Sequence, residues 1–233
     1  NLHSPRNCAE WGSVFFDHPV VKNRSDAVSY HTWWSDDPEQ YKAIKQFAEE
    51  KGKPVWATEV GYCALREGCT LNGEKHYLRP ETWETAWDYA MSYYRAIDWS
   101  GASRVYHWAL LGHNAIVGKN GEKLPSYYIF KQFANYISPG SVYIGSSTDD
   151  ENILSMLFKL PDNTFSAIII NKAEKEKQIF LKPKGGVKKY KASEIVTSIE
   201  GRYERYIDAE NDNAGHLLFA VPGKSITSLK FKK

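Results

Sequence analysis

The first 138 residues alternate between short apolar runs and longer amphipathic segments. Three apolar runs are expected to form β-strands: residues 25–34, 54–60 and 102–110. Three amphipathic segments are expected to form helices: residues 39–52, 80–101 and 124–137. In the first of these, Pro38 suits the opening turn and Gly52 suits the end. Three successive strand–helix units predict parallel strands joined by right-handed crossovers.

The pattern changes after Ser138-Pro139-Gly140-Ser141. Six short apolar or alternating runs follow, at residues 152–160, 165–172, 177–182, 190–199, 216–221 and 225–232. Turn residues such as Pro161-Asp162-Asn163 separate them, which is typical of an antiparallel β-sandwich. We therefore expect two domains, at residues 1–138 and 139–233, and we expect the second to be structural or accessory.

Three strand–helix units are too few to close into a barrel. A (β/α)8 TIM barrel takes about 250 residues, or about 31 per unit. An open sheet of three strands would leave its edges poorly covered. The length of the first domain therefore favours the C-terminal part of a (β/α)8 barrel, followed by the sandwich, which is an α/β plus all-β fold class.

Composition removes two function classes. The net charge of +2 is too small for a nucleic-acid-binding surface, and no apolar run approaches the ~18 residues that span a bilayer. Aromatic residues reach 14%, with eight Trp and fifteen Tyr, which pack cores and also stack on sugar rings. Cys63 and Cys69 are close enough to bridge a loop, and Asn23-Arg24-Ser25 is a glycosylation sequon. We expect a secreted or extracytoplasmic protein, with reduced cytosolic thiols as the alternative.

Each of the three predicted strands ends in polar or aromatic residues: Tyr30-His31, Thr58-Glu59 and His107-Trp108. In TIM barrels the active site lies at the C-terminal ends of the strands. A Glu inside a buried strand is costly unless it is paired, whereas a Glu at a strand exit can be a working group. Taken singly, each could be a satisfied buried polar residue, but together they predict a site centred on Glu59.

Four segments carry a resemblance to clan A glycoside hydrolases, most closely to family 30. The segments "VSYHTWW", "PVWATEVG" and "ASRVYHWAL" resemble the sixth, seventh and eighth barrel strands. The segment "YYIFKQFANYISPGSVYI" resembles the last barrel helix and its link into a β-sandwich. The resemblance covers nearly the whole chain.

The resemblance implies a retaining hydrolase of β-linked glycans that needs no metal and no organic cofactor. Glu59 matches the nucleophile, and Tyr30 or His31 would hold it ionised and oriented. Trp108 would stack on the sugar beside the cleaved bond, with Trp33 and Trp34 as weaker candidates. His107 completes the set of expected substrate-binding residues.

The sequence departs from the family in one respect. The acid/base of this clan is a Glu that follows an Asn, and the 233 residues contain no Asn-Glu dipeptide. Glu10 is a conceivable substitute without supporting context. The chain is thus expected to be one piece of a hydrolase, with an upstream segment or a second polypeptide completing the barrel.

Two other interpretations stay open. One is a non-catalytic carbohydrate-binding or structural protein derived from a glycosidase, and the other is an independent three-strand domain. The sequence leaves the sugar, the linkage and endo or exo action undecided. We expect the loop at residues 62–80, with Arg66 and Arg79, to rim the cleft and to affect specificity.

Overall fold

The computed structural model describes residues 4–61, 70–71, 74–75, 81–112, 115–182, 191–211 and 216–232. The chain forms two compact units, Asn1–Ser126 and Tyr127–Lys233. This division falls earlier than the boundary expected after residue 138, which stays a prediction. Most of helix α5 (Pro125–Tyr136) accordingly groups with the second unit. Among the described residues, no helix has both the length and the apolar character to cross a membrane.

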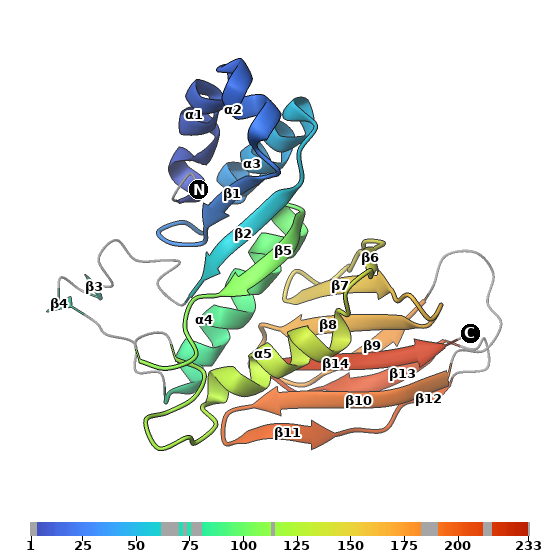
Figure 1. Cartoon of the computed structure of the whole chain (residues 1–233). Helices are drawn as coiled ribbons and strands as arrows, with labels where there is room; N and C mark the ends of the chain where they lie inside the picture. Colours follow the sequence, from blue (N-terminus) through green and yellow to red (C-terminus); the bar gives the residue numbers. More distant parts are fainter. Residues whose placement is uncertain are drawn as a thin grey trace. The chain divides into compact units, whose positions relative to one another are not determined.

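The first unit is built on a parallel three-stranded sheet in the order β1-β2-β5 (Figure 1). The strands are β1 (Val28–His31), β2 (Val55–Val60) and β5 (Ala102–His107). Helices α3 (Pro38–Lys51) and α4 (Trp83–Tyr94) connect them. Preceding this sheet are α1 (Pro5–Phe16) and α2 (Pro19–Arg24), and β3 (Thr70–Leu71) pairs with β4 (Glu74–Lys75). The predicted parallel strand–helix units, shorter at their ends than expected, are confirmed.

Local sequence explains the helix ends. The Asp37 carboxylate accepts a hydrogen bond from the Glu39 amide at 2.9 Å, and Gly52 ends α3 with a φ of 65°. Helix α4 begins later than predicted because Thr82 is its cap, accepting from the Thr85 amide at 3.3 Å. The α-helix ends at Tyr94 and continues as a π-helical turn, Arg95–Trp99, so the predicted segment 80–101 contains two kinds of helix.

The two faces of the parallel sheet differ in burial. Val28, Tyr30 and Ala57 are fully buried, and the Tyr30 ring packs edge-on against Tyr41 of α3 at 5.8 Å. Neighbouring positions point to the opposite face, where the Arg104 guanidinium lies 4.5 Å from the centre of the Trp56 ring. The helix-covered face is therefore the hydrophobic core of this unit.

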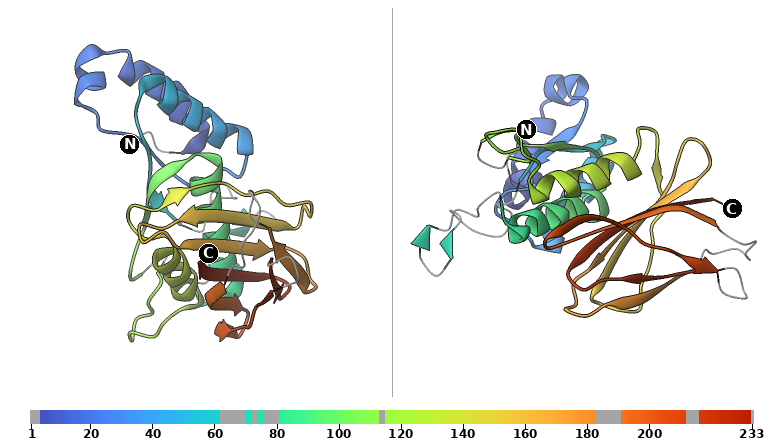
Figure 2. Two further views of the ribbon diagram at one scale, coloured as in Figure 1. Left: turned by 90° about the vertical axis from the view of Figure 1, so that its right-hand side faces the viewer. Right: turned by 90° about the horizontal axis from the view of Figure 1, so that it is seen from below.

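The second unit is an antiparallel β-sandwich, as predicted (Figure 2). One sheet has the order β11-β10-β14-β8-β7-β6 and the other has the order β12-β13-β9. The bounds in chain order are β6 (Val142–Tyr143), β7 (Ile153–Lys159), β8 (Phe165–Asn171), β9 (Lys177–Leu181), β10 (Lys191–Ile199), β11 (Arg202–Tyr206), β12 (Glu210–Asn211), β13 (Leu217–Val221) and β14 (Ser225–Lys232). The core between the sheets contains Ile169, Ile195, Leu217, Phe219 and Leu229.

Helix α5 is bonded to the six-stranded sheet through its polar side chains. The Gln132 amide nitrogen donates to Ser198 Oγ at 2.6 Å, and Ser228 Oγ donates to the Gln132 amide oxygen at 2.7 Å. Ser166 Oγ donates to the Tyr136 carbonyl. Strand β8 is buried along almost its whole length because it has the sandwich core on one face and this second layer on the other.

Candidate active site

The end of β2 is held by both neighbouring strands. The Thr32 amide donates to the Glu59 carbonyl at 3.0 Å, which continues the pairing of β1 beyond His31. On the other side the Trp108 amide donates to the Val60 carbonyl, also at 3.0 Å. Glu59 is therefore carried on backbone that is hydrogen-bonded from both sides, which fixes the origin of its side chain.

A bulge in β2 sets the direction of the Glu59 side chain. Pairing with β1 runs from Tyr30 opposite Ala57 directly to His31 opposite Glu59, which leaves Thr58 as an extra residue. The pairing between β2 and β5 is also irregular between Ala57 and Val60. Thr58 and Glu59 are consecutive and both partly exposed, although a regular strand would alternate. Such bulges recur beside active sites, where they redirect a side chain.

Two nitrogen atoms contact the same carboxylate oxygen of Glu59. His31 Nδ1 lies 2.9 Å from Oε2, and Trp33 Nε1 donates to Oε2 at 3.1 Å. An ionised carboxylate only accepts hydrogen bonds, so His31 carries a proton on Nδ1. The side chains of His31 and Glu59 are 11% and 23% exposed, so water screens this contact only partly. Donors of this kind orient a carboxylate and favour its ionised form.

Aromatic rings border the carboxylate. Trp33 packs edge-on against Trp108, with ring centres 6.0 Å apart, and Trp108 is 49% exposed. Trp34 has a φ of 61°, a left-handed conformation that is unusual for a bulky residue. The structure thus brings His31 and Trp33 to Glu59, and Trp108 to Trp33; that these residues form a site stays a prediction.

Two tyrosines of α4 contact His107. The Tyr93 hydroxyl and His107 Nδ1 are 2.6 Å apart, and the Tyr89 ring centre lies 4.7 Å from that of His107. Burial raises the pKa of Tyr93, so its hydroxyl stays protonated. The hydrogen bond and the ring contact together fix the orientation of the His107 ring.

Tyr30 is placed differently from the expectation. Its side chain is fully buried, and its hydroxyl is paired with Ser100 Oγ at 2.7 Å. Burial is the main cause that raises its pKa. Tyr30 therefore belongs to the core beneath the sheet, because its side chain points to the helix-covered face, and it is His31 that contacts Glu59.

Sequence reasoning missed one contact, the hydrogen bond from the Trp33 indole to Glu59. Trp33 was expected only as a stacking surface, and the tight turn that brings its N–H back to β2 leaves no signal in the pattern. Glu10 is exposed on α1. The predicted Cys63–Cys69 pair, Arg66 and Arg79 lie outside the described residues. Within the described ranges, no group of three or more His, Cys, Asp and Glu side chains is arranged to hold a metal ion.

Comparisons with known proteins identify the fold. Residues 140–229 match the family model described as the glycosyl hydrolase family 30 beta sandwich domain. A family 30 endoxylanase from Clostridium papyrosolvens is similar with a TM-score of 0.73 and 16% identity, over 95% of this chain and 53% of its own. Xylanase C of family 30 from Talaromyces cellulolyticus is similar with a TM-score of 0.70 and 15% identity, over 98% of this chain and 50% of its own. An endo-β1,6-glucanase is similar with a TM-score of 0.61 and 18% identity, over 99% of this chain and 48% of its own.

The chain has the fold of the C-terminal part of a family 30 glycoside hydrolase, with barrel strands followed by the family's β-sandwich. It spans about half the length of these solved enzymes. No curated protein matches the chain. The expected resemblance and fold class are confirmed.

Proposed function

We propose that the chain is the nucleophile-bearing part of a retaining glycoside hydrolase that cleaves β-glycosidic bonds. One observation carries the proposal: the Glu59 carboxylate lies at a bulged strand end, with His31 Nδ1 and Trp33 Nε1 both on its Oε2. A carboxylate that serves only structure would gain nothing from a bulge and a partly exposed position. The family 30 fold supports the same interpretation.

In this mechanism Glu59 attacks the anomeric carbon and forms a covalent glycosyl–enzyme intermediate. A second carboxyl group, about 5–5.5 Å from the first, protonates the leaving oxygen and later activates water. The 233 residues contain no Asn-Glu dipeptide, so an upstream segment or a second polypeptide would supply that group. His31 and Trp33 would hold Glu59 ionised until attack and would stabilise it again as the leaving carboxylate during hydrolysis.

The proposed substrate is a β-linked polysaccharide or glycoconjugate. Trp108 offers an exposed ring, braced edge-on by Trp33, to the C–H face of a sugar beside Glu59. The similar enzymes are named for xylan and for β1,6-glucan, which supports both as candidate substrates. A secreted or extracytoplasmic location would suit such substrates, and one similar structure is of an exported protein from Bacteroides fragilis.

The experiment is a burst assay with 2,4-dinitrophenyl β-glycosides of xylose, glucose and galactose. Dinitrophenolate leaves without an acid catalyst, so the reaction tests the nucleophile alone. The proposal predicts release of about one equivalent of dinitrophenolate per chain with at least one sugar, and none for Glu59→Gln. Glu10→Gln, which removes an exposed carboxylate on α1, is the matched control and is expected to give the burst of the original chain.

A second candidate is a non-catalytic carbohydrate-binding protein derived from a glycosidase. The pair of Trp33 and Trp108 beside the strand ends favours it, since stacking surfaces alone suffice for binding. Saccharide binding without a burst, unchanged in Glu59→Gln, would support this candidate against the hydrolase.

A further inference from the structure

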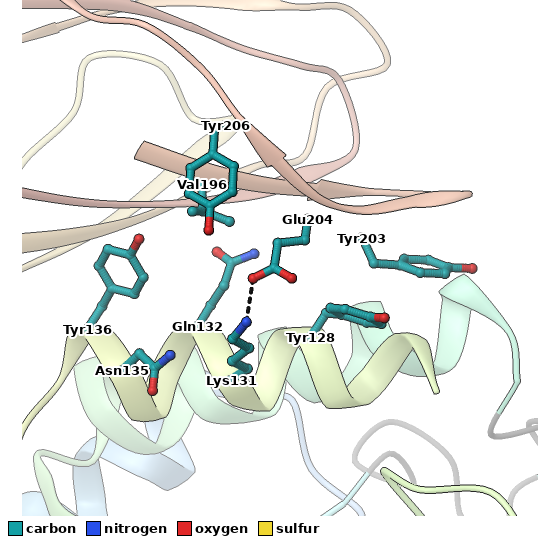
Figure 3. Close-up of a pocket in the computed structure, with 9 residues that line it drawn as sticks. All are labelled: Tyr128, Lys131, Gln132, Asn135, Tyr136, Val196, Tyr203, Glu204 and Tyr206. Atoms are coloured by element: carbon teal, nitrogen blue, oxygen red, sulfur yellow. Dashed lines mark hydrogen bonds and ion pairs between the residues drawn. The ribbon is translucent and has the colours of Figure 1, made fainter. Parts of the chain in front are cut away.

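A pocket of about 120 Å³ lies within the second unit, between α5 and strands β10 and β11 (Figure 3). Tyrosines line it from both sides: Tyr128 and Tyr136 from α5, and Tyr203 and Tyr206 from β11. Whole small-molecule sites usually measure about 300–1,000 Å³. This pocket is smaller, so it suits one ring of a longer ligand that otherwise lies on the surface.

The middle of the pocket holds one ammonium group and one carboxylate. Lys131 Nζ lies 2.5 Å from Glu204 Oε1, and both side chains are about one-third exposed, at 38% and 30%. The hydrogen bond to Glu204 raises the pKa of Lys131, which keeps the ammonium charged. An ammonium has three N–H donors and a carboxylate has several acceptor positions, so this contact uses only part of their capacity. A donor and an acceptor side by side match two adjacent hydroxyl groups of one ring.

The tyrosines offer ring surface next to these polar groups. Tyr206 is 66% exposed, and its ring stands opposite α5 in Figure 3. Tyr128 and Tyr203 stack on each other, with ring centres 5.4 Å apart and planes 24° apart, and so brace one side of the pocket. A ring face binds the apolar C–H side of a sugar, while the hydroxyl groups at the sugar's edge need polar partners.

The floor of the pocket is rigid. The Gln132 amide is hydrogen-bonded to Ser198 and Ser228 of the sheet below, which fixes α5 over β10 and β14. Val196 of β10 adds an apolar surface there. A site built in advance loses little conformational entropy when a ligand binds.

From these features we propose that the second unit carries a saccharide-binding subsite, formed by Tyr206, Lys131, Glu204 and Asn135, that takes one pyranose ring of a β-linked chain. The paired charges disfavour an anionic ligand, because Glu204 would repel a phosphate or a carboxylate beside Lys131. Every residue of the subsite lies in the second unit and Glu59 lies in the first, whereas the choice of a β-linked saccharide rests on the proposed function.

The test is an NMR titration of the 15N-labelled full chain carrying Glu59→Gln, which prevents turnover. Xylohexaose, cellohexaose and a β1,6-linked glucohexaose are added in turn. The backbone amides of β11 and the Asn135 side-chain amide report the subsite, and the Trp33 indole N–H reports the region of Glu59. We expect saturable shifts at β11 and Asn135 with at least one saccharide.

Variants connect the shifts to the residues. Tyr206→Ala is expected to weaken binding at the subsite by about tenfold, and Glu204→Gln tests the hydroxyl contact without changing side-chain shape. Phe180→Ala is the matched control, because it removes a 52% exposed ring from β9 of the same unit. Absence of subsite shifts with all three saccharides, or equal weakening by Phe180→Ala, would overturn the proposal. Shifts with a proline-rich decapeptide alone would overturn it in favour of peptide binding.

Discussion

His31 Nδ1 lies 2.9 Å from Glu59 Oε2, across the two strands β1 and β2. The contact exists because the bulge at Thr58 brings His31 directly opposite Glu59. Trp33 Nε1 adds a second donor to the same oxygen at 3.1 Å. The first strand and the turn after it therefore position a carboxylate that is carried by the second strand, and no single segment of sequence contains the site.

Removal of one donor tests this positioning. His31→Phe and Trp33→Phe each delete an N–H and keep a ring. Hydrogen bonds to a charged group contribute about 1.5–3 kcal/mol, so each variant is expected to slow the dinitrophenolate burst by about ten- to a hundredfold. His18→Phe, at an exposed position before α2, is the matched control and should leave the burst rate unchanged. Equal rates for His31→Phe and the original chain would show that the contact has no role in attack.

For Tyr30 we expect an effect on stability and no effect on the burst. Tyr30→Phe deletes the hydroxyl that pairs with Ser100 in the core, which should lower the free energy of unfolding by about 1 kcal/mol. The burst amplitude should not change. All eight tryptophans lie at or before residue 108, so Trp fluorescence during urea unfolding reports the first unit. A loss of burst with unchanged stability would show that Tyr30 acts in the site and not only in the core.

Gln132 should matter for the second unit. Gln132→Leu leaves Ser228 and Ser198 without the amide that joins α5 to the sheet, at a cost of about 1–3 kcal/mol. The second unit has no tryptophan, so its unfolding is followed by far-UV circular dichroism. The dichroism transition should move to lower urea concentration while the Trp transition stays in place. Movement of the Trp transition alone would contradict the role of Gln132 in stabilising the second unit.

Cys8 is predicted to be unreactive in the folded protein. Its side chain is fully buried, and burial raises the pKa of the thiol from 9.0 to about 12. At pH 8 only about one chain in ten thousand then carries the thiolate that reacts with disulfide reagents. In a Cys63→Ser/Cys69→Ser variant, no thiol should react until denaturant is added. Rapid labelling of the native variant would show that Cys8 is accessible.

The raised pKa of Cys8 also makes the stability of the fold depend on pH in the alkaline range. The unfolded chain loses the Cys8 proton first as pH rises above 9, so the stability that this group contributes falls between pH 9 and about 12. Below pH 9 that contribution is fully present.

The sequence predicted the fold well where periodicity was strong. The three parallel strands and the helices between them followed from apolar runs, Pro38 and Gly52, because these signals are local. Strand β11 was missed: in Arg202–Tyr206 three of five residues are charged, as is common at the edge of a sheet. The π-helical turn at Arg95–Trp99 has no sequence pattern that separates it from α-helix.

The candidate site was proposed from the sequence in outline, and its role stays a prediction. Glu59, His31 and Trp108 were selected as candidates because barrel sites gather at strand ends. Tyr30 and His31 are adjacent, so a strand places them on opposite faces, and only the register with β2 decides which one meets Glu59. The Trp33 contact depends on the conformation of the turn, including the left-handed Trp34, and no residue type there announces it.

The measurement that tests the central claim most directly is covalent trapping. The chain is mixed with 2-fluoro β-glycosyl fluorides of xylose, glucose and galactose, and its intact mass is measured before peptide mapping. Fluoride leaves without acid assistance, so the nucleophile alone is needed. The account predicts a mass gain of one sugar, mapped to Glu59 and absent in Glu59→Gln. A label on another residue, or no label with any of these sugars, would contradict the claim that this chain carries the working nucleophile.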